Sequence, residues 1–132
     1  MNFTLKIVTP KGIYLEKEIE SLTVRTTDGQ IGILAHHLPL ASPLEIAEMH
    51  FMANGQKEEY AVAGGFVYVG KDVTTIIANA IESQEEIDLE RAQAAKKRAE
   101  DRLHSGSADI DYIRAEIALK KAINRINLKG MY

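Results

Sequence analysis

The 132-residue chain contains no cysteine and only three prolines. Without cysteine, disulfide bonds, thiolate zinc sites and thiol nucleophiles are all excluded. No stretch approaches the ~18 apolar residues of a membrane-spanning helix, and residues 1–10 lack the basic segment and apolar run of a secretory signal. We therefore expect any link to a membrane to come only through partner proteins.

The sequence also lacks a strong excess of charge of one sign. It has 16 Lys and Arg and 19 Asp and Glu, a net charge of -3. This balance argues against a general nucleic-acid-binding protein, whose affinity comes largely from neutralising phosphates. The sequence has no phosphate-binding loop, nucleophile elbow or zincin motif, and no carboxylate pair stands out as acid and base. We therefore expect no catalytic residues.

The first part of the chain, residues 1–84, has the period of β-strands. Phe3, Leu5 and Ile7 alternate with polar residues, as do Leu22 and Val24. Turn signals separate these runs at Thr9-Pro10-Lys11-Gly12, Asp28-Gly29, Asn54-Gly55 and Gly70-Lys71-Asp72. Many short strands with close turns predict a sandwich or a barrel.

The second part, residues 85–132, is rich in Ala, Glu, Lys and Arg and predicts two antiparallel helices. The first helix starts either with a capping box at Ser83 and Glu86 or with Asp88 as its cap. It ends near His104-Ser105-Gly106, and Ser107 or Asp109 caps the second helix, which continues to about Leu128.

The facing stripes of this helical hairpin consist largely of alanine, which removes little apolar area from water. We expect the hairpin to be marginally stable alone, as a switch requires. From residue 112 onward, five basic residues accompany a single acidic one. This basic helix is either a solvated face or a docking surface for an acidic partner.

Two motifs carry a family resemblance: the segment from Gly29 to Leu40, GQIGILAHHLPL, and Ile87-Asp88-Leu89-Glu90-Arg91-Ala92. Together with Val8-Thr9-Pro10 and Gly64-Gly65-Phe66, they make the chain resemble, over its whole length, the epsilon subunit of bacterial F-type ATP synthases.

The resemblance implies an N-terminal flattened β-sandwich that joins the gamma subunit to the c-ring. It also implies a C-terminal helical hairpin that folds down on the sandwich or extends towards the catalytic alpha and beta subunits and inhibits ATP hydrolysis. Several members bind ATP on the folded hairpin, so ATP is expected as a regulatory ligand and no cofactor is required. The location implied is the cytoplasmic face of the bacterial membrane, peripheral, with proton or sodium coupling left open.

The resemblance also implies site residues. Those for ATP are Glu82, Ile87, Asp88, Arg91, Ala92, Arg98, Lys121 and Arg125. Those for the gamma and c-ring interface are Gln30, His37, Pro39 and Leu40, and those for docking on the beta subunit are Lys120, Lys121, Arg125 and Lys129.

The chain departs from its relatives at three places. Many relatives have Pro-Gly where this chain has Ala35-His36, and an acidic residue where it has Gln30. Lys121 stands where ATP-binding relatives have arginine, and lysine lacks the planar fork that binds phosphate through two bonds. We expect weaker ATP affinity and altered rotor contacts as a result.

Helical geometry supports a site for an anion independently of the resemblance. If the turn centres near residues 105–107, Arg91 lies level with Lys121, and Asp88 nearly level with Arg125. The alternative is an ion pair between Asp88 and Arg125 among solvated cations.

Three histidines, His36, His37 and His50, are candidate ligands of a metal ion. Neighbours on a strand point to opposite faces and no carboxylate triad is near, so we expect no metal there. Two other functions compete with the subunit of an ATP synthase, namely a free-standing nucleotide sensor and a small hydrolase built on the β-domain.

Overall fold

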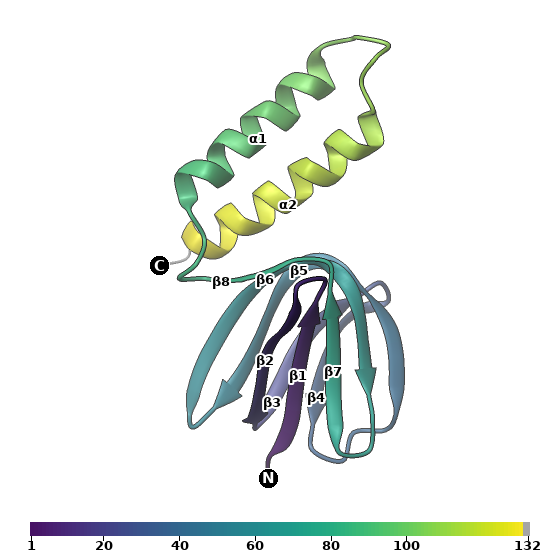
Figure 1. Ribbon diagram of the computed structural model, residues 1–132, viewed down its shortest axis with the longest axis vertical. Coiled ribbons are helices and arrows are strands. Elements are labelled where there is room, and N and C mark those ends of the chain that lie inside the picture. The colour runs from purple at the N-terminus through teal and green to yellow at the C-terminus, as the bar shows by residue number, and fades with distance from the viewer. Residues whose placement is uncertain (131–132) are drawn as a thin grey trace. The chain divides into compact units, whose positions relative to one another are not determined.

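The computed structural model describes residues 1–130, which form two compact units: residues 1–83, and residue 84 onward (Figure 1). The fold expected from the sequence, a β-domain followed by a two-helix hairpin, is confirmed. Met131 and Tyr132, which the expected helical domain included, lie outside the described residues. Each unit is described below by itself.

The first unit is an eight-stranded sheet. Its strands are β1 (Phe3–Thr9), β2 (Gly12–Ile19), β3 (Ser21–Thr26), β4 (Gly29–Leu34), β5 (Leu40–Ala53), β6 (Gln56–Val69), β7 (Val73–Ala78) and β8 (Ile81–Ser83). Their order is β2-β1-β7-β6-β5-β3-β4, and β8 pairs with β6. All pairs are antiparallel except β1 with β7.

The long strand β6 changes neighbours along its length. Gly65–Val69 of β6 pairs with β7, whereas Tyr60–Val62 pairs with β8. The change falls at Gly64 and Gly65, which both have positive φ, 81° and 137°. A Cβ on Gly65 would lie 2.0 Å from the Ile77 carbonyl oxygen, so only glycine fits where β6 passes this close to β7.

The alternating apolar residues form one core, as their period predicts. Its fully buried members include Leu5 and Ile7 of β1, Leu22 of β3 and Phe51 of β5. All members of this core lie between residues 5 and 81. The sandwich unit therefore has a hydrophobic core of its own.

The predicted turns are confirmed. Pro10 and Lys11 connect β1 to β2, and Gly12 has φ 116°. Asn54 and Gly55, with φ 53° and 74°, form the two-residue connection between β5 and β6 that Asn-Gly favours. Gly29, with φ 122°, begins β4.

The second unit is the helical hairpin of α1 (Leu89–His104) and α2 (Tyr112–Gly130). Asp88 is the N-cap of α1, because its Oδ1 accepts a hydrogen bond from the backbone N–H of Arg91 (3.1 Å). This decides between the two starts expected from the sequence, since Ser83 lies in β8. The expected end at His104 is confirmed, and Gly106 has φ 67°.

The expected start of α2 is wrong. Asp111, not Ser107 or Asp109, is the N-cap, and its Oδ1 accepts from the N–H of Arg114 (3.0 Å). The hydroxyl of Ser107 instead accepts from the N–H of Asp109 (3.2 Å) inside the connection. The physical reason is that Ser and Asp stabilise turns as readily as helix ends, so several candidates in one loop compete.

Within residues 1–130, neither helix is both long enough and apolar enough to span a membrane.

Candidate functional site

The hairpin places several of its basic side chains on one flank. Buried alanines recur every seven residues in both helices, so antiparallel packing pairs Ala92 with Ala122 and Ala99 with Ala115. Arg91, Arg98, Arg114 and Lys121 each precede one of these alanines and are exposed. In antiparallel helices, residues preceding the contact on each helix lie on the same side, so these four cations share a flank.

The other residues of this unit that were expected to bind ATP lie near the start of α1 and the facing part of α2. Asp88 caps α1, while Ile87 and Ala92 are buried, 3% and 0% exposed. Arg125 follows Ala122 by three residues on the same flank, and its Nε is buried. Four of the basic residues on this flank are among those expected to bind ATP, and they are here called the basic flank: Arg91, Arg98, Lys121 and Arg125.

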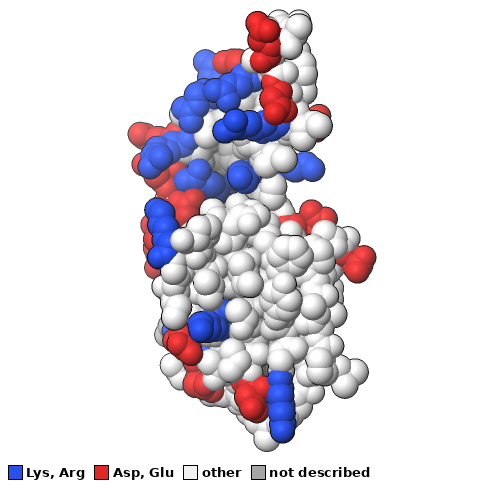
Figure 2. Space-filling view, turned by 45° about the vertical axis from the view of Figure 1, so that its right-hand side comes forward, with Lys and Arg blue, Asp and Glu red and all other residues white. Residues whose placement is uncertain are grey.

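The register of the hairpin differs slightly from the expected one. With the alanine pairs above, Arg91 lies level with residue 123, so Lys121 is offset by two residues, about 3 Å along the axis. This offset is small compared with the reach of Arg and Lys side chains. Figure 2 shows Lys and Arg side chains gathered on one face of the hairpin.

Glu82 stands apart from the other expected ATP residues. It lies in β8, half-buried, and pairs with Ala61 of β6, so it belongs to the sandwich unit.

A groove at the hairpin connection was not predicted from the sequence. It is open, has a volume of about 440 Å³, and is lined by Arg102, Asp109, Ile110, Asp111, Arg114 and Ala115. None of the expected ATP residues lines it. The groove could not be predicted from the start expected for α2. A helix beginning at Ser107 or Asp109 would leave no connection long enough to form it.

The cations expected to dock on the beta subunit differ in their surroundings. Lys120 and Lys121 are exposed. Lys129 donates a hydrogen bond from its Nζ to the carbonyl oxygen of Gln84 (2.9 Å), and the side-chain amide of Gln84 donates to the Leu128 carbonyl oxygen (3.2 Å). Lys129 therefore also ties the end of α2 to the start of the unit.

The expected rotor residues of the sandwich unit fall into two places. His37, Pro39 and Leu40 lie in the connection after β4 and at the start of β5, whereas Gln30 lies at the opposite end of β4. His37 Nδ1 is 2.7 Å from the Leu38 carbonyl oxygen, and Leu38 is 80% exposed. His36, where the resemblance implies glycine in many relatives, has φ 66°, a conformation that glycine adopts more easily.

A second surface of the sandwich unit was also not predicted from the sequence. Pro43, Phe66, Ile77, Val8 and Ile13 are register partners across five strands, so they form one apolar row on the outer face. Phe66 is 46%, Ile77 43% and Ile13 61% exposed. Figure 2 shows a broad surface of this unit with few charged side chains. Exposed apolar rows of this kind are typical of protein interfaces.

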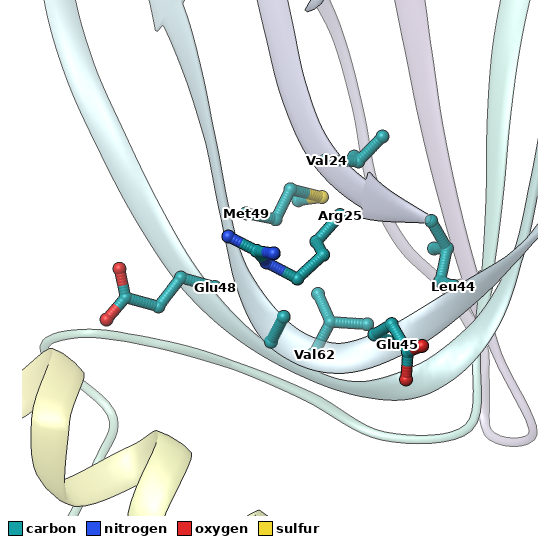
Figure 3. Close-up of a pocket in the computed structure, with 8 residues that line it drawn as sticks. Val24, Arg25, Leu44, Glu45, Glu48, Met49 and Val62 are labelled. Carbon is teal, nitrogen blue, oxygen red and sulfur yellow. The ribbon is translucent and has the colours of Figure 1, made fainter. Parts of the chain in front are cut away.

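Polar residues gather where β5 bends. The cavity there has a volume of about 10 Å³, the space of a single water molecule, and Arg25, Glu45, Glu48 and Met49 are among its lining residues (Figure 3). A cavity of this size cannot hold an organic substrate.

Nearby on β5 and β6, His50 is the register partner of Glu59, and Lys57 Nζ lies 3.0 Å from Glu59 Oε1. Burial lowers the pKa of His50 from its usual 6.5, and Lys57 lowers it further while Glu59 opposes this. Burial and then Glu59 raise the pKa of Glu48 above 4.5, against the effect of Lys57. Between Met1 and Gly130, no three His, Asp or Glu side chains are close enough together to hold a metal ion.

Both units match known families. Residues 2–84 match the family of the ATP synthase delta/epsilon chain β-sandwich domain, and residues 85–130 match the long α-helix domain of the same chain. The protein class defined by the fold and these matches is a subunit of the ATP synthase complex. The chain belongs to the ATP synthase delta/epsilon chain family.

The individual relatives are more specific. The chain is 50% identical over 127 residues to the ATP synthase epsilon chain of Bacillus licheniformis, covering 95% of this chain and 97% of the relative. It is 46% identical over 125 residues to the epsilon chain of Desulfitobacterium hafniense, covering 95% and 94%. The resemblance to bacterial epsilon subunits is thus confirmed.

Solved structures agree on the fold. A chain of the Euglena gracilis mitochondrial ATP synthase structure superposes with a TM-score of 0.84 at 25% identity, covering 99% of this chain and 82% of that one. A chain from the central stalk and c-ring of Tetrahymena thermophila mitochondrial ATP synthase has a TM-score of 0.58 at 16% identity, which bears on the fold alone.

Proposed function

We propose that this chain is a non-catalytic central-stalk subunit that couples the gamma subunit to the c-ring and restrains ATP hydrolysis through its helical hairpin. The observation that carries the proposal is the match of both units, over nearly the whole chain, to epsilon chains of ATP synthases. The location that follows is the cytoplasmic face of the bacterial membrane, with the complex as the only link to the lipid.

The sandwich unit is the rotor anchor. Its independent core gives a stable platform, and its apolar row offers a surface that a protein partner would cover. The connection containing His37, Pro39 and the exposed Leu38 offers a second contact at one end of β4. Gamma and the c-ring are the partners proposed for these surfaces.

The hairpin is the regulatory part, and ATP is its ligand. Arg91 and Arg98 on α1 and Lys121 and Arg125 on α2 can reach one phosphate chain only while the two helices lie side by side. A ligand that binds only this folded form stabilises it by RT ln(1 + [L]/Kd), about 1.4 kcal/mol at ten times Kd. High ATP therefore favours the non-inhibitory form, and falling ATP releases the hairpin.

Calorimetry and purification test these two parts separately. ATP should bind the isolated chain, and Lys121→Arg should tighten binding because the guanidinium restores two parallel bonds to phosphate. The chain should copurify with gamma. A chain that binds ATP but never gamma would be a free-standing nucleotide sensor, and turnover of ATP by the purified chain would favour a hydrolase.

The basic surface of α2 is proposed to restrain hydrolysis by approaching an acidic surface of the beta subunit. Lys120 tests this most cleanly, because Lys121 and Arg125 belong to the basic flank and Lys129 contacts Gln84. Lys120→Glu should raise ATP hydrolysis by the reconstituted enzyme up to ~5-fold, since an exposed ion pair contributes up to ~1 kcal/mol.

Lys97→Glu makes the same change of charge at an exposed position of α1 and serves as the control. Equal hydrolysis rates for the two variants would reject electrostatic docking through α2.

A further inference from the structure

The edge strand β4 has hydrogen-bonding groups that the described residues leave unused. It lies at the end of the strand order and pairs only with β3. In an antiparallel pair, alternate residues direct both N–H and C=O towards the partner strand, and the residues between them direct these groups away. Half of the backbone N–H and C=O groups of β4 therefore point away from β3, beyond the edge of the sheet.

Two hydrogen bonds identify the outward-pointing residues. The carbonyl oxygen of Gly29 accepts from the hydroxyl of Thr26 on β3 (2.8 Å), so Gly29 faces β3. The carbonyl oxygen of Leu34 accepts from the N–H of His37 in the following connection (3.1 Å), so Leu34 faces away. By alternation, the N–H and C=O groups of Gln30 and Gly32 point outward together with the N–H of Leu34.

Gly32 has no role within the chain that requires glycine. Its φ lies outside the positive range that favours glycine, and a Cβ built on it would meet nothing within 4 Å. Glycine inside a strand weakens it, and often marks a place where another backbone approaches closely. At Gly32 that backbone must come from outside the described residues.

The two edges of the sheet are built differently. The opposite edge, β2, carries Glu16, Lys17 and Glu18, and its pairing with β1 has a bulge. Such charges and irregularities keep foreign strands from pairing with an edge. β4 carries no charged residue and no proline, and its pairing with β3 is regular.

We infer that β4 is a docking edge, and that an extended strand of the gamma subunit pairs with it through the outward backbone groups of Gln30, Gly32 and Leu34. The inference rests on the proposed function, because it names the partner of the same domain. β4 runs directly into the connection proposed to contact the rotor, and Leu34 and Leu38, 63% and 80% exposed, provide apolar contacts beside the new strand. Backbone hydrogen bonds supply affinity in this mode of recognition.

Two substitutions at Gly32 separate backbone pairing from side-chain contact. Gly32→Pro removes the outward N–H and blocks the edge, but leaves the ladder to β3 intact, because that N–H does not face β3. Gly32→Ala adds a Cβ and keeps the N–H. Affinity for isolated gamma should fall at least ~10-fold for Gly32→Pro relative to Gly32→Ala, while both variants keep the unfolding midpoint of the unaltered chain within a few degrees.

Hydrogen exchange on the unaltered chain gives a second measurement, which holds even if the proline variant fails to fold. The amides of Gln30, Gly32 and Leu34 should exchange quickly in the free chain and become protected in the complex with gamma. Those of Ile31 and Ile33 should be protected in both states.

Four results would overturn the inference. Affinity of Gly32→Pro equal to that of the unaltered chain, or fast exchange of the outward amides in the complex, would do so while leaving gamma as the partner. Protection that depends on the concentration of the free chain would assign the edge to a second copy of this chain. An unaltered chain that does not bind gamma would instead reject the proposed function, and the inference with it.

Discussion

Gly65 is the position of the sandwich unit at which one added methyl group has the largest expected effect. A Cβ there would lie 2.0 Å from the Ile77 carbonyl oxygen, and φ is 137°. Because the obstacle is backbone, Gly65→Ala should lower the free energy of unfolding by at least ~3 kcal/mol. Urea denaturation measures this.

The matched control is Gly32→Ala, which adds the same methyl group where nothing lies within 4 Å. It should leave stability unchanged or raise it slightly, because alanine loses less conformational freedom on folding than glycine. A similar loss for both variants would contradict the close approach of β6 to β7.

His50 gives the sandwich unit a specific pH dependence. Its pKa is lower in the folded chain than its usual 6.5, so below that pH the unfolded chain binds more protons at this site. Stability contributed by neutral His50 is therefore present above pH 6.5 and is lost as pH falls below it.

The replacement His50→Gln removes this contribution. The difference in unfolding free energy between His50→Gln and the unaltered chain should shift in favour of the variant as pH falls from 7 to 5. Parallel stability profiles over that range would show that His50 has no lowered pKa.

At the scale of elements, the start of α1 has two roles to separate. Asp88 was expected to contribute to ATP binding, and the structure shows that its carboxylate caps the helix. Asp88→Ala should destabilise the first turn of α1 by ~1 kcal/mol and weaken ATP binding by disordering Arg91, whereas Asp88→Asn should keep the cap and most of the affinity.

Circular dichroism and ATP calorimetry on both variants check this. If Asp88→Asn binds ATP as weakly as Asp88→Ala while retaining its helix content, the carboxylate contacts the ligand directly.

The sequence predicted the elements to different degrees. Strands β1 and β3 could be predicted from their alternating residues, and the turn between β5 and β6 from Asn54-Gly55. Both signals are local in the sequence. The start of α2 could not be predicted, since three nearby residues can each cap a helix and the local sequence does not show that Asp111 does so. The groove at the connection depends on this choice of cap.

The apolar row could not be predicted for a different reason. Pro43, Phe66, Ile77, Val8 and Ile13 are far apart in the chain, and only the pairing of five strands brings them together. Registers between distant strands depend on tertiary packing. The basic flank, by contrast, could be predicted, because helical spacing and one antiparallel connection nearly determine it.

At the scale of the whole molecule, the two units differ in how much apolar surface they bury, which suits them to different roles. The sandwich unit has an extended core within residues 5–81, whereas the buried set of the hairpin is mainly alanine. The first is suited to the proposed attachment to the rotor, and the second to the proposed change of conformation in response to ATP.

One measurement tests these two roles most directly: the ATPase rate and subunit content of the complex reconstituted with residues 1–84 alone. We expect this fragment to bind gamma as the full chain does, and the complex to hydrolyse ATP faster than with the full chain. A folded fragment that fails to bind gamma, or a bound one that leaves the hydrolysis rate unchanged, would contradict it.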